Sequence, residues 1–136
     1  MKIKLLITYT SLLMLMLTAC SVGAPEPKLE GTTWELVKMD EKLPLADTTI
    51  TLKFEVGQAG GNAGCNSYGG AYDLNGDSLK LDELMSTMMY CDAEGVMEQE
   101  TAYLLFLSQV RSYAILDGAL YLSQADGREL KFIPQK

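Results

Sequence analysis

Histidine does not occur among the 136 residues of this chain. It is the side chain whose unperturbed pKa lies closest to neutral pH, the usual base in Ser-His and Cys-His pairs, and a common zinc ligand. Catalysis would therefore have to depend on carboxylates, lysine or tyrosine. We expect a protein that is not an enzyme, with no catalytic residues, no metal site and no cofactor.

The chain also lacks an apolar run long enough to cross a membrane as a helix. The run Leu5–Leu17 is shorter than the roughly 20 residues that a helical span needs. Lys2 and Lys4 precede it and small residues follow it, which is the pattern of a secretory signal peptide. Leu-Thr-Ala-Cys at 17–20 resembles the lipobox of bacterial lipoproteins. We therefore predict a signal peptide over residues 1–19 and a lipid on Cys20.

The lipid on Cys20 would determine where the protein works. Residues 20–28 contain two prolines, which predicts an extended tether rather than part of a core. The domain would then be anchored in the cell envelope, outside the cytoplasmic membrane. Because Ser21 rather than Asp follows the cysteine, this would be the outer membrane if the host is Gram-negative. The alternative is cleavage at Val22-Gly23-Ala24, which would discard Cys20 and release a soluble protein.

Positive charge is scarce. Eleven Lys and Arg residues oppose 18 Asp and Glu residues, which gives a net charge of −7. An acidic protein repels phosphate backbones and does not dock on anionic lipid through a basic patch. Nucleic acid is therefore not an expected partner. The expected partners are the membrane, through the lipid on Cys20, and an unidentified envelope protein or apolar ligand.

Cysteine occurs only three times. If Cys20 is acylated, Cys65 and Cys91 remain as an even pair in an oxidising compartment, where a disulfide is the usual state. The alternative is two free thiols, one of which could act as a nucleophile or redox centre. The disulfide is the favoured interpretation.

Alternation of apolar and polar residues predicts strands, most clearly in Thr49–Glu55, where Ile50, Leu52 and Phe54 share one face. Helical spacing predicts a single helix over Asp92–Gln109, and Asn75-Gly76 predicts a hairpin turn. Further strands are expected over Thr32–Met39, Ala71–Leu74, Ser78–Leu84, Ser112–Leu116, Ala119–Ser123 and Arg128–Ile133. The fold class is therefore mainly β: a single compact β-barrel-like domain, a rolled antiparallel sheet with one α-helix, over residues 29–136.

A glycine-rich stretch, 61–72, is the most distinctive part of the domain. It is not a phosphate-binding loop, because no Gly-Lys-Ser/Thr follows it. The glycines indicate a place where the backbone bends or packs closely, such as a bulge or a barrel corner.

Three segments resemble the META/HslJ family of bacterial envelope proteins: Leu29–Trp34, Gly64–Gly70 and Ser86–Cys91. The resemblance implies a small barrel-like β domain, often lipid-anchored, and in some members a link with heat shock and antibiotic tolerance. It transfers no catalytic residue. Cys65 and Cys91 match the two motif cysteines, which supports their pairing. The motif residues of unknown role are Trp34, Gly64, Asn66, Tyr68, Gly69, Gly70, Thr87 and Met88.

Two further clusters have a structural and a chemical interpretation. Met85, Met88 and Met89, close to Cys91, could bind Cu(I) through soft sulfur atoms, but we expect them to fill gaps in the core. Glu94, Glu98 and Glu100 could be catalytic carboxylates, but we expect a solvated helix start, where the helix dipole favours negative charge.

The leading hypothesis is a non-enzymatic, lipid-anchored envelope protein that binds or supports other envelope components under stress. A first alternative is a small β-barrel that holds an acyl chain or another apolar ligand. A second alternative is a Met/Cys copper-binding or thiol redox protein.

Overall fold

The strands of the barrel follow the alternation of apolar side chains. The computed structural model describes residues 28–135. In β2 (Thr51–Glu55), Leu52 and Phe54 are fully buried, whereas Lys53 and Glu55 face solvent. The predicted signal peptide, Cys20 and all but the last residue of the predicted tether lie outside the described residues.

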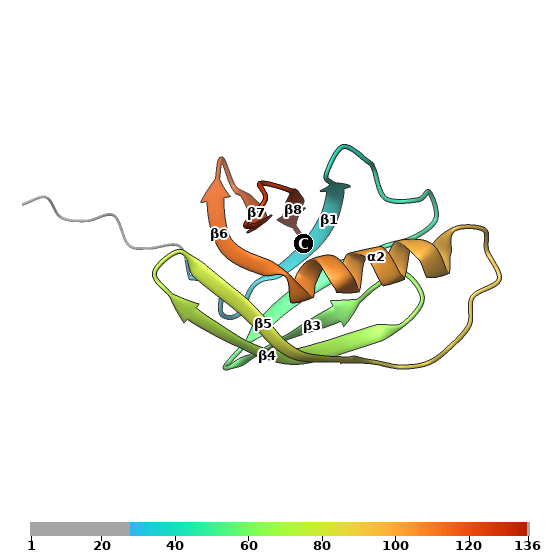
Figure 1. The fold of residues 1–136 in the computed structure, drawn as a ribbon, viewed down its shortest axis with the longest axis horizontal. Coiled ribbons are helices and arrows are strands. Elements are labelled where there is room, and N and C mark those ends of the chain that lie inside the picture. The colour runs from blue at the N-terminus through green and yellow to red at the C-terminus, as the bar shows by residue number, and fades with distance from the viewer. Residues whose placement is uncertain (1–27, 136) are drawn as a thin grey trace, which may run out of the picture.

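Eight antiparallel strands close into one barrel, and a single helix accompanies them in the described part of the chain (Figure 1). Each strand pairs with the next in sequence, and the last pairs with the first. Besides β2, the elements are β1 (Thr33–Met39), β3 (Gln58–Asn62), β4 (Ser67–Asn75), β5 (Ser78–Ser86), α2 (Val96–Ser108), β6 (Val110–Leu116), β7 (Ala119–Gln124) and β8 (Glu129–Pro134). The predicted fold class is confirmed.

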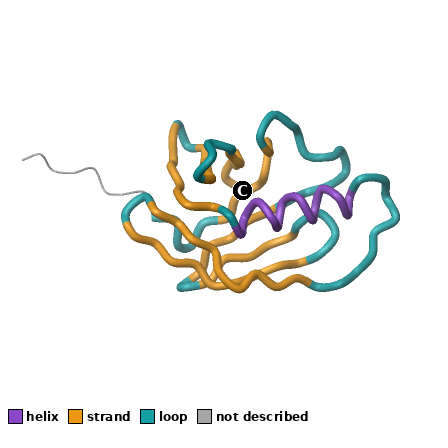
Figure 2. The backbone as a smooth tube through the Cα atoms, in the orientation of Figure 1, coloured by secondary structure: helices purple, strands orange, loops and turns teal. Residues whose placement is uncertain are grey.

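The seam between β5 and β6 is the most sparsely paired part of the barrel, because only Ser78 and Ser112 pair across it. Helix α2 connects these two strands and packs against β5 (Figure 2). Its buried side chains, among them Tyr103 and Leu107, belong to the same core as the strand residues. The helix therefore completes the core where strand pairing is weakest.

The protein's own side chains fill the interior of the barrel. Phe54, Tyr103 and Phe132 are fully buried there. The Tyr68 hydroxyl donates to the carbonyl oxygen of Thr51 at 2.8 Å, so the Tyr103 hydroxyl donates to Tyr68 Oη at 2.7 Å. Burial raises the pKa of both phenols above the usual value, which keeps this polar pair neutral inside the apolar core.

The structure differs from the sequence prediction in the glycine-rich stretch. The first two residues of this stretch, Gly61 and Asn62, are the last two residues of β3. Strand β4 begins at Ser67, four residues before the strand predicted over Ala71–Leu74. The hairpin turn is also shifted by one residue. Asn75 pairs with Ser78, so the loop is Gly76-Asp77, and Gly76 has φ +62°. A glycine at the first loop position is typical of a type II′ turn rather than the Asn-Gly type.

The helix is shorter than predicted at its N-terminal end. It begins at Val96 rather than Asp92, and Gly95 in the preceding position has φ +79°. Residues 87–95 instead form a loop between β5 and α2. This loop contains Thr87, Met88 and Cys91, which the sequence analysis singled out.

The glycines of β3 and β4 are of two kinds. A Cβ on Gly61 would overlap the carbonyl oxygen of Thr51, and a Cβ on Gly70 would lie 2.5 Å from the carbonyl oxygen of Asp82. A Cβ on Gly69 would make only an ordinary contact, 3.6 Å from the carbonyl oxygen of Ala59, and no positive φ restricts that residue. Strand packing therefore requires glycine at 61 and 70 but not at 69.

We therefore expect Gly61→Ala and Gly70→Ala each to lower the free energy of unfolding by about 1–3 kcal/mol, because backbone atoms must move to admit the methyl group. Gly69→Ala should leave stability unchanged or raise it by about 0.5 kcal/mol, since alanine restricts the unfolded chain. Urea unfolding of the three variants measures the difference. Equal midpoints for all three would contradict the packing argument.

Candidate functional site

Asn66 is the centre of a buried polar network between the β3–β4 connection and the β5–α2 loop. Only 1% of its surface is exposed. Its Oδ1 accepts hydrogen bonds from the backbone N–H of Met89 and the hydroxyl of Thr87, both at 2.7 Å. Its Nδ2 donates to the carbonyl oxygen of Met89 at 3.0 Å. One side chain therefore binds both backbone polar groups of Met89 and the hydroxyl of Thr87.

Glu100, on α2, completes this network from the other side. One oxygen, Oε2, accepts from the backbone N–H groups of Asn66 (2.7 Å) and Cys65 (3.1 Å). The other oxygen, Oε1, accepts from Asn66 Nδ2 at 2.7 Å. The residue is 5% exposed, so the expectation of a solvated carboxylate is wrong for Glu100, while Glu94 and Glu98 are exposed as expected. These three N–H donors offset the free-energy cost of burying the Glu100 carboxylate.

A signal for Glu100 was present in the sequence but was not used. Val96, Glu100, Tyr103 and Leu107 follow the spacing of a single helical face, and the other three are buried core residues. An acidic residue on an apolar helical face has to find partners inside the protein.

A disulfide joins Cys65 to Cys91, as the sequence favoured. The disulfide links Cys65, the neighbour of Asn66, to the middle of the β5–α2 loop, 26 positions further along the chain. The backbone N–H of Cys91 also donates to Met97 Sδ at 3.5 Å. The loop is thus held to the barrel at Thr87, Met89 and Cys91.

The side chains of Met88, Met89 and Tyr90 in this loop, and that of Met85 near the end of β5, in contrast, face solvent. The exposed fractions are 76% for Met85, 98% for Met88, 57% for Met89 and 82% for Tyr90. The expectation that the methionines fill the core is therefore wrong. We call Met85, Met88, Met89 and Tyr90 the methionine loop. Four large apolar side chains on one short, fixed segment are typical of an interaction surface.

A groove lies on the outer face of the barrel and reaches Met85 at one edge. Strand register places Lys53, Gly60, Gly69 and Met85 in one row across β2 to β5, so that each residue is paired with the next. Directly paired residues share a face of the sheet. The two central positions carry no side chain, and a groove of about 820 Å³ results.

Charged and polar side chains surround the glycines of this groove. Lys53, ion-paired with Glu55, stands at one edge, and Glu83 and Met85 stand at the other. We call this the glycine groove. Of the motif residues, it includes Tyr68, Gly69, Gly70 and Thr87. Sequence reasoning missed Lys53, Gly60 and Met85 as part of it, since only the register brings them together.

The other motif residues have structural positions. Trp34 is buried in the core, and its Nε1 donates to Thr32 Oγ1 at 2.6 Å. Gly64 has φ +115°, which favours glycine, and its backbone N–H donates to Asn62 Oδ1 at 2.7 Å. Met88 contributes only its exposed side chain to the methionine loop.

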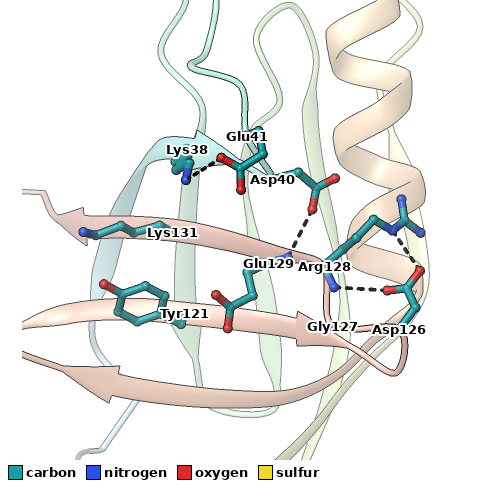
Figure 3. A pocket seen from close by; sticks show the side chains of 9 residues that line it. All are labelled: Lys38, Asp40, Glu41, Tyr121, Asp126, Gly127, Arg128, Glu129 and Lys131. Carbon is teal, nitrogen blue, oxygen red and sulfur yellow. Dashed lines mark hydrogen bonds and ion pairs between the residues drawn. The ribbon is translucent and has the colours of Figure 1, made fainter.

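A second hollow, of about 570 Å³, lies between the end of β1 and the β7–β8 hairpin (Figure 3). Two ion pairs lie among its charged residues: Lys38 with Glu41 at 3.3 Å and Arg128 Nε with Asp126 at 2.9 Å. Hydrogen bonds from Arg128 lower the pKa of the Asp126 carboxyl. Such exposed pairs are weak. This hollow has the character of a solvated surface.

Among residues 28–135, no group of three or more Asp, Glu or Cys side chains is arranged to hold a metal ion. Helix α2 does not have the length and apolar character that a membrane-spanning helix needs.

Known proteins resemble this chain in sequence and in fold. The family model of the META domain matches residues 27–136, which confirms the resemblance found in the sequence. No curated protein matches the chain. An NMR structure of a protein from Burkholderia xenovorans has a TM-score of 0.68 and 28% identity, and the match covers 85% of this chain and 94% of that one. A second NMR structure, at 20% identity, shares the fold with a TM-score of 0.64, over 77% of this chain and 90% of that one.

The Asn66 network gives a prediction about stability. Asn66→Asp replaces a donor, Nδ2, with an oxygen that would face the acceptors Met89 O and Glu100 Oε1. We expect the free energy of unfolding to fall by about 3 kcal/mol, as when a buried hydrogen-bonded charge loses its partner.

Asn62→Asp is the matched control, because it keeps the oxygen that accepts from Gly64 N–H in a less buried position. Its effect should stay within about 0.5 kcal/mol. Urea unfolding of both variants provides the measurement. If the two variants unfolded at the same urea concentration, Asn66 would not have the role assigned to it.

Proposed function

The chain belongs to the META domain family, and on this premise we propose that it is a non-enzymatic lipoprotein of the cell envelope that binds another envelope component during stress or antibiotic exposure. The lipobox at 17–20 supports the anchor. The absence of histidine supports a binding role rather than catalysis. The family resemblance supports the link with stress.

The observation that carries the proposal is the glycine groove. Glycine inside a strand is destabilising relative to alanine by roughly 0.5–1 kcal/mol, and packing does not require it at position 69. Gly69 instead leaves open the middle of the outer surface, between Lys53 and Met85. A surface kept open at a cost in stability is suited to receive a partner.

The two alternatives have less support. An acyl chain would need room inside the barrel, but large apolar side chains occupy that space, and both hollows described above lie outside it. A thiol redox role would use free cysteines, whereas Cys65 and Cys91 are joined in a disulfide. The disulfide also removes the Cys91 thiolate from the soft sulfur ligands that a Cu(I) site would use. Binding at the outer surface is therefore the function we favour.

The anchor has a direct test. Cys20→Ser removes the acylation site, and we expect the protein to move from the membrane fraction to the soluble fraction of the envelope. Fractionation and the mass of the mature chain, with and without the substitution, provide the measurement. An unmodified wild-type mass that begins after Ala24 would disprove the lipoprotein assignment.

The groove has a separate test. Gly69→Leu places a side chain into the groove at a position that tolerates a Cβ, and Gly69→Ala is the matched control. In cells, the full chain carrying a C-terminal tag would be cross-linked and captured from detergent extracts. We expect envelope proteins that are captured with wild type and Gly69→Ala to be lost with Gly69→Leu.

A strain without the gene, complemented with each variant, extends this test to physiology. Gly69→Leu should fail to restore survival under heat and antibiotic challenge, while Gly69→Ala should restore it. Full complementation by Gly69→Leu, with an unchanged set of captured proteins, would show that the groove is not the binding surface.

A further inference from the structure

We propose that the methionine loop is a docking surface for an amphipathic segment of a partner protein whose apolar side is flanked by Lys and Arg. This inference rests on the binding function proposed above and defines the chemistry of the partner. It is carried by three observations: fixed backbone with exposed apolar side chains, segregated charge, and the position of the loop on the barrel.

The first observation is the contrast between the backbone and the side chains of the loop. Asn66 and the disulfide hold the backbone at Thr87, Met89 and Cys91. The side chains of Met88 and Tyr90 nevertheless remain almost fully exposed. A surface fixed in this way loses little conformational entropy when a partner binds. Methionine adapts its shape to different apolar side chains, which suits a docking surface.

The second observation is the distribution of charge. Residues 81–110 contain no Lys or Arg and six acidic residues, which accounts for most of the net charge of −7. Glu100 is buried, and the other five are exposed and lie on both sides of residues 88–90 in the sequence: Asp82, Glu83, Asp92, Glu94 and Glu98. An apolar centre with an acidic rim attracts a partner that has apolar side chains with basic neighbours.

The third observation is where the loop lies. Met85 belongs both to the methionine loop and to the edge of the glycine groove, so the two surfaces are continuous. Along the longest axis of the molecule, the start of the described chain, drawn in blue, lies near one end, and the loop between β5 and α2 reaches the other (Figure 1). A tether that ends at residue 28 would thus leave the loop turned away from the membrane. This position favours a protein partner over the lipid surface.

The test measures binding of designed peptides to the full mature chain, purified in a non-ionic detergent. The probe is a fluorescent helical peptide with leucine along one side and lysine on its flanks. A second peptide has glutamate in place of lysine, and a third has the Leu/Lys composition in scrambled order. We expect the first peptide to bind at least about tenfold more tightly than the other two, with binding that weakens as salt increases.

Substitutions then locate the site. The triple variant Met85→Gln, Met88→Gln, Met89→Gln removes apolar surface without touching the core, and Kd should rise at least about tenfold. The matched control is Leu43→Gln with Leu116→Gln, two exposed residues outside the methionine loop, which should change Kd less than about twofold. Neutralising Glu83, Asp92 and Glu94 should weaken binding and reduce its salt dependence.

Several results would overturn the inference. Equal binding of the lysine and glutamate peptides would remove the charge argument, and an unchanged Kd in the triple methionine variant would place the site elsewhere. If a chain that carries Cys20→Ser adhered to phosphatidylcholine vesicles, and the triple substitution abolished that adhesion with peptide binding intact, the methionine loop would be a lipid surface instead. If Gly69→Leu abolished capture of envelope proteins and the triple variant did not, the proposed function would stand and the docking role of the methionine loop would be disproved.

Discussion

The hydrogen bonds between Asn66 and the buried carboxylate of Glu100 are the interaction on which the rest of the site depends. An isolated buried carboxylate is costly, and three donors from residues 65 and 66 offset that cost. The same donors fix Asn66, whose remaining polar atoms bind the backbone of Met89. The helix, the β3–β4 connection and the β5–α2 loop thus depend on one network, so a change at Glu100 would disturb Met89 without direct contact.

This network explains how an apolar segment can remain exposed in a stable domain. A short segment with four large apolar side chains would ordinarily gain free energy by burying them against the barrel. Here Asn66 binds the backbone of Met89 and the disulfide holds Cys91, while the side chains of Met88 and Tyr90 remain in solvent. The hydrogen bonds that determine the loop's conformation are separate from the side chains available for contact. Substitution of the methionines therefore tests binding and leaves the fold intact.

Much of the fold could be predicted from the sequence, because side-chain alternation reports burial directly. Leu52 and Phe54 in β2 are an example. Strand β3 was missed because Gly60 and Gly61 carry no side chain and therefore show no alternation. The methionines were misplaced for a different reason: apolar residues are usually buried, whereas here the long-range hydrogen bonds of Asn66 and the disulfide fix the backbone of this loop. The site depends on contacts between residues 20 to 35 positions apart, which local pattern does not contain.

The glycine groove and the methionine loop share Met85 and together form one contact surface. A partner that contacts only the methionine loop would find a small area, since the loop is short, and stable protein interfaces bury about 800 Å² on each side. The row from Lys53 through Gly60 and Gly69 extends the contact surface across several strands from Met85. Glycine at 69 lets an elongated segment lie close to the sheet, and the methionines can adapt to its end. A segment that combines both surfaces would have to be apolar on one side and basic along its edges, since Glu83 lines the groove and exposed acids follow it in the sequence.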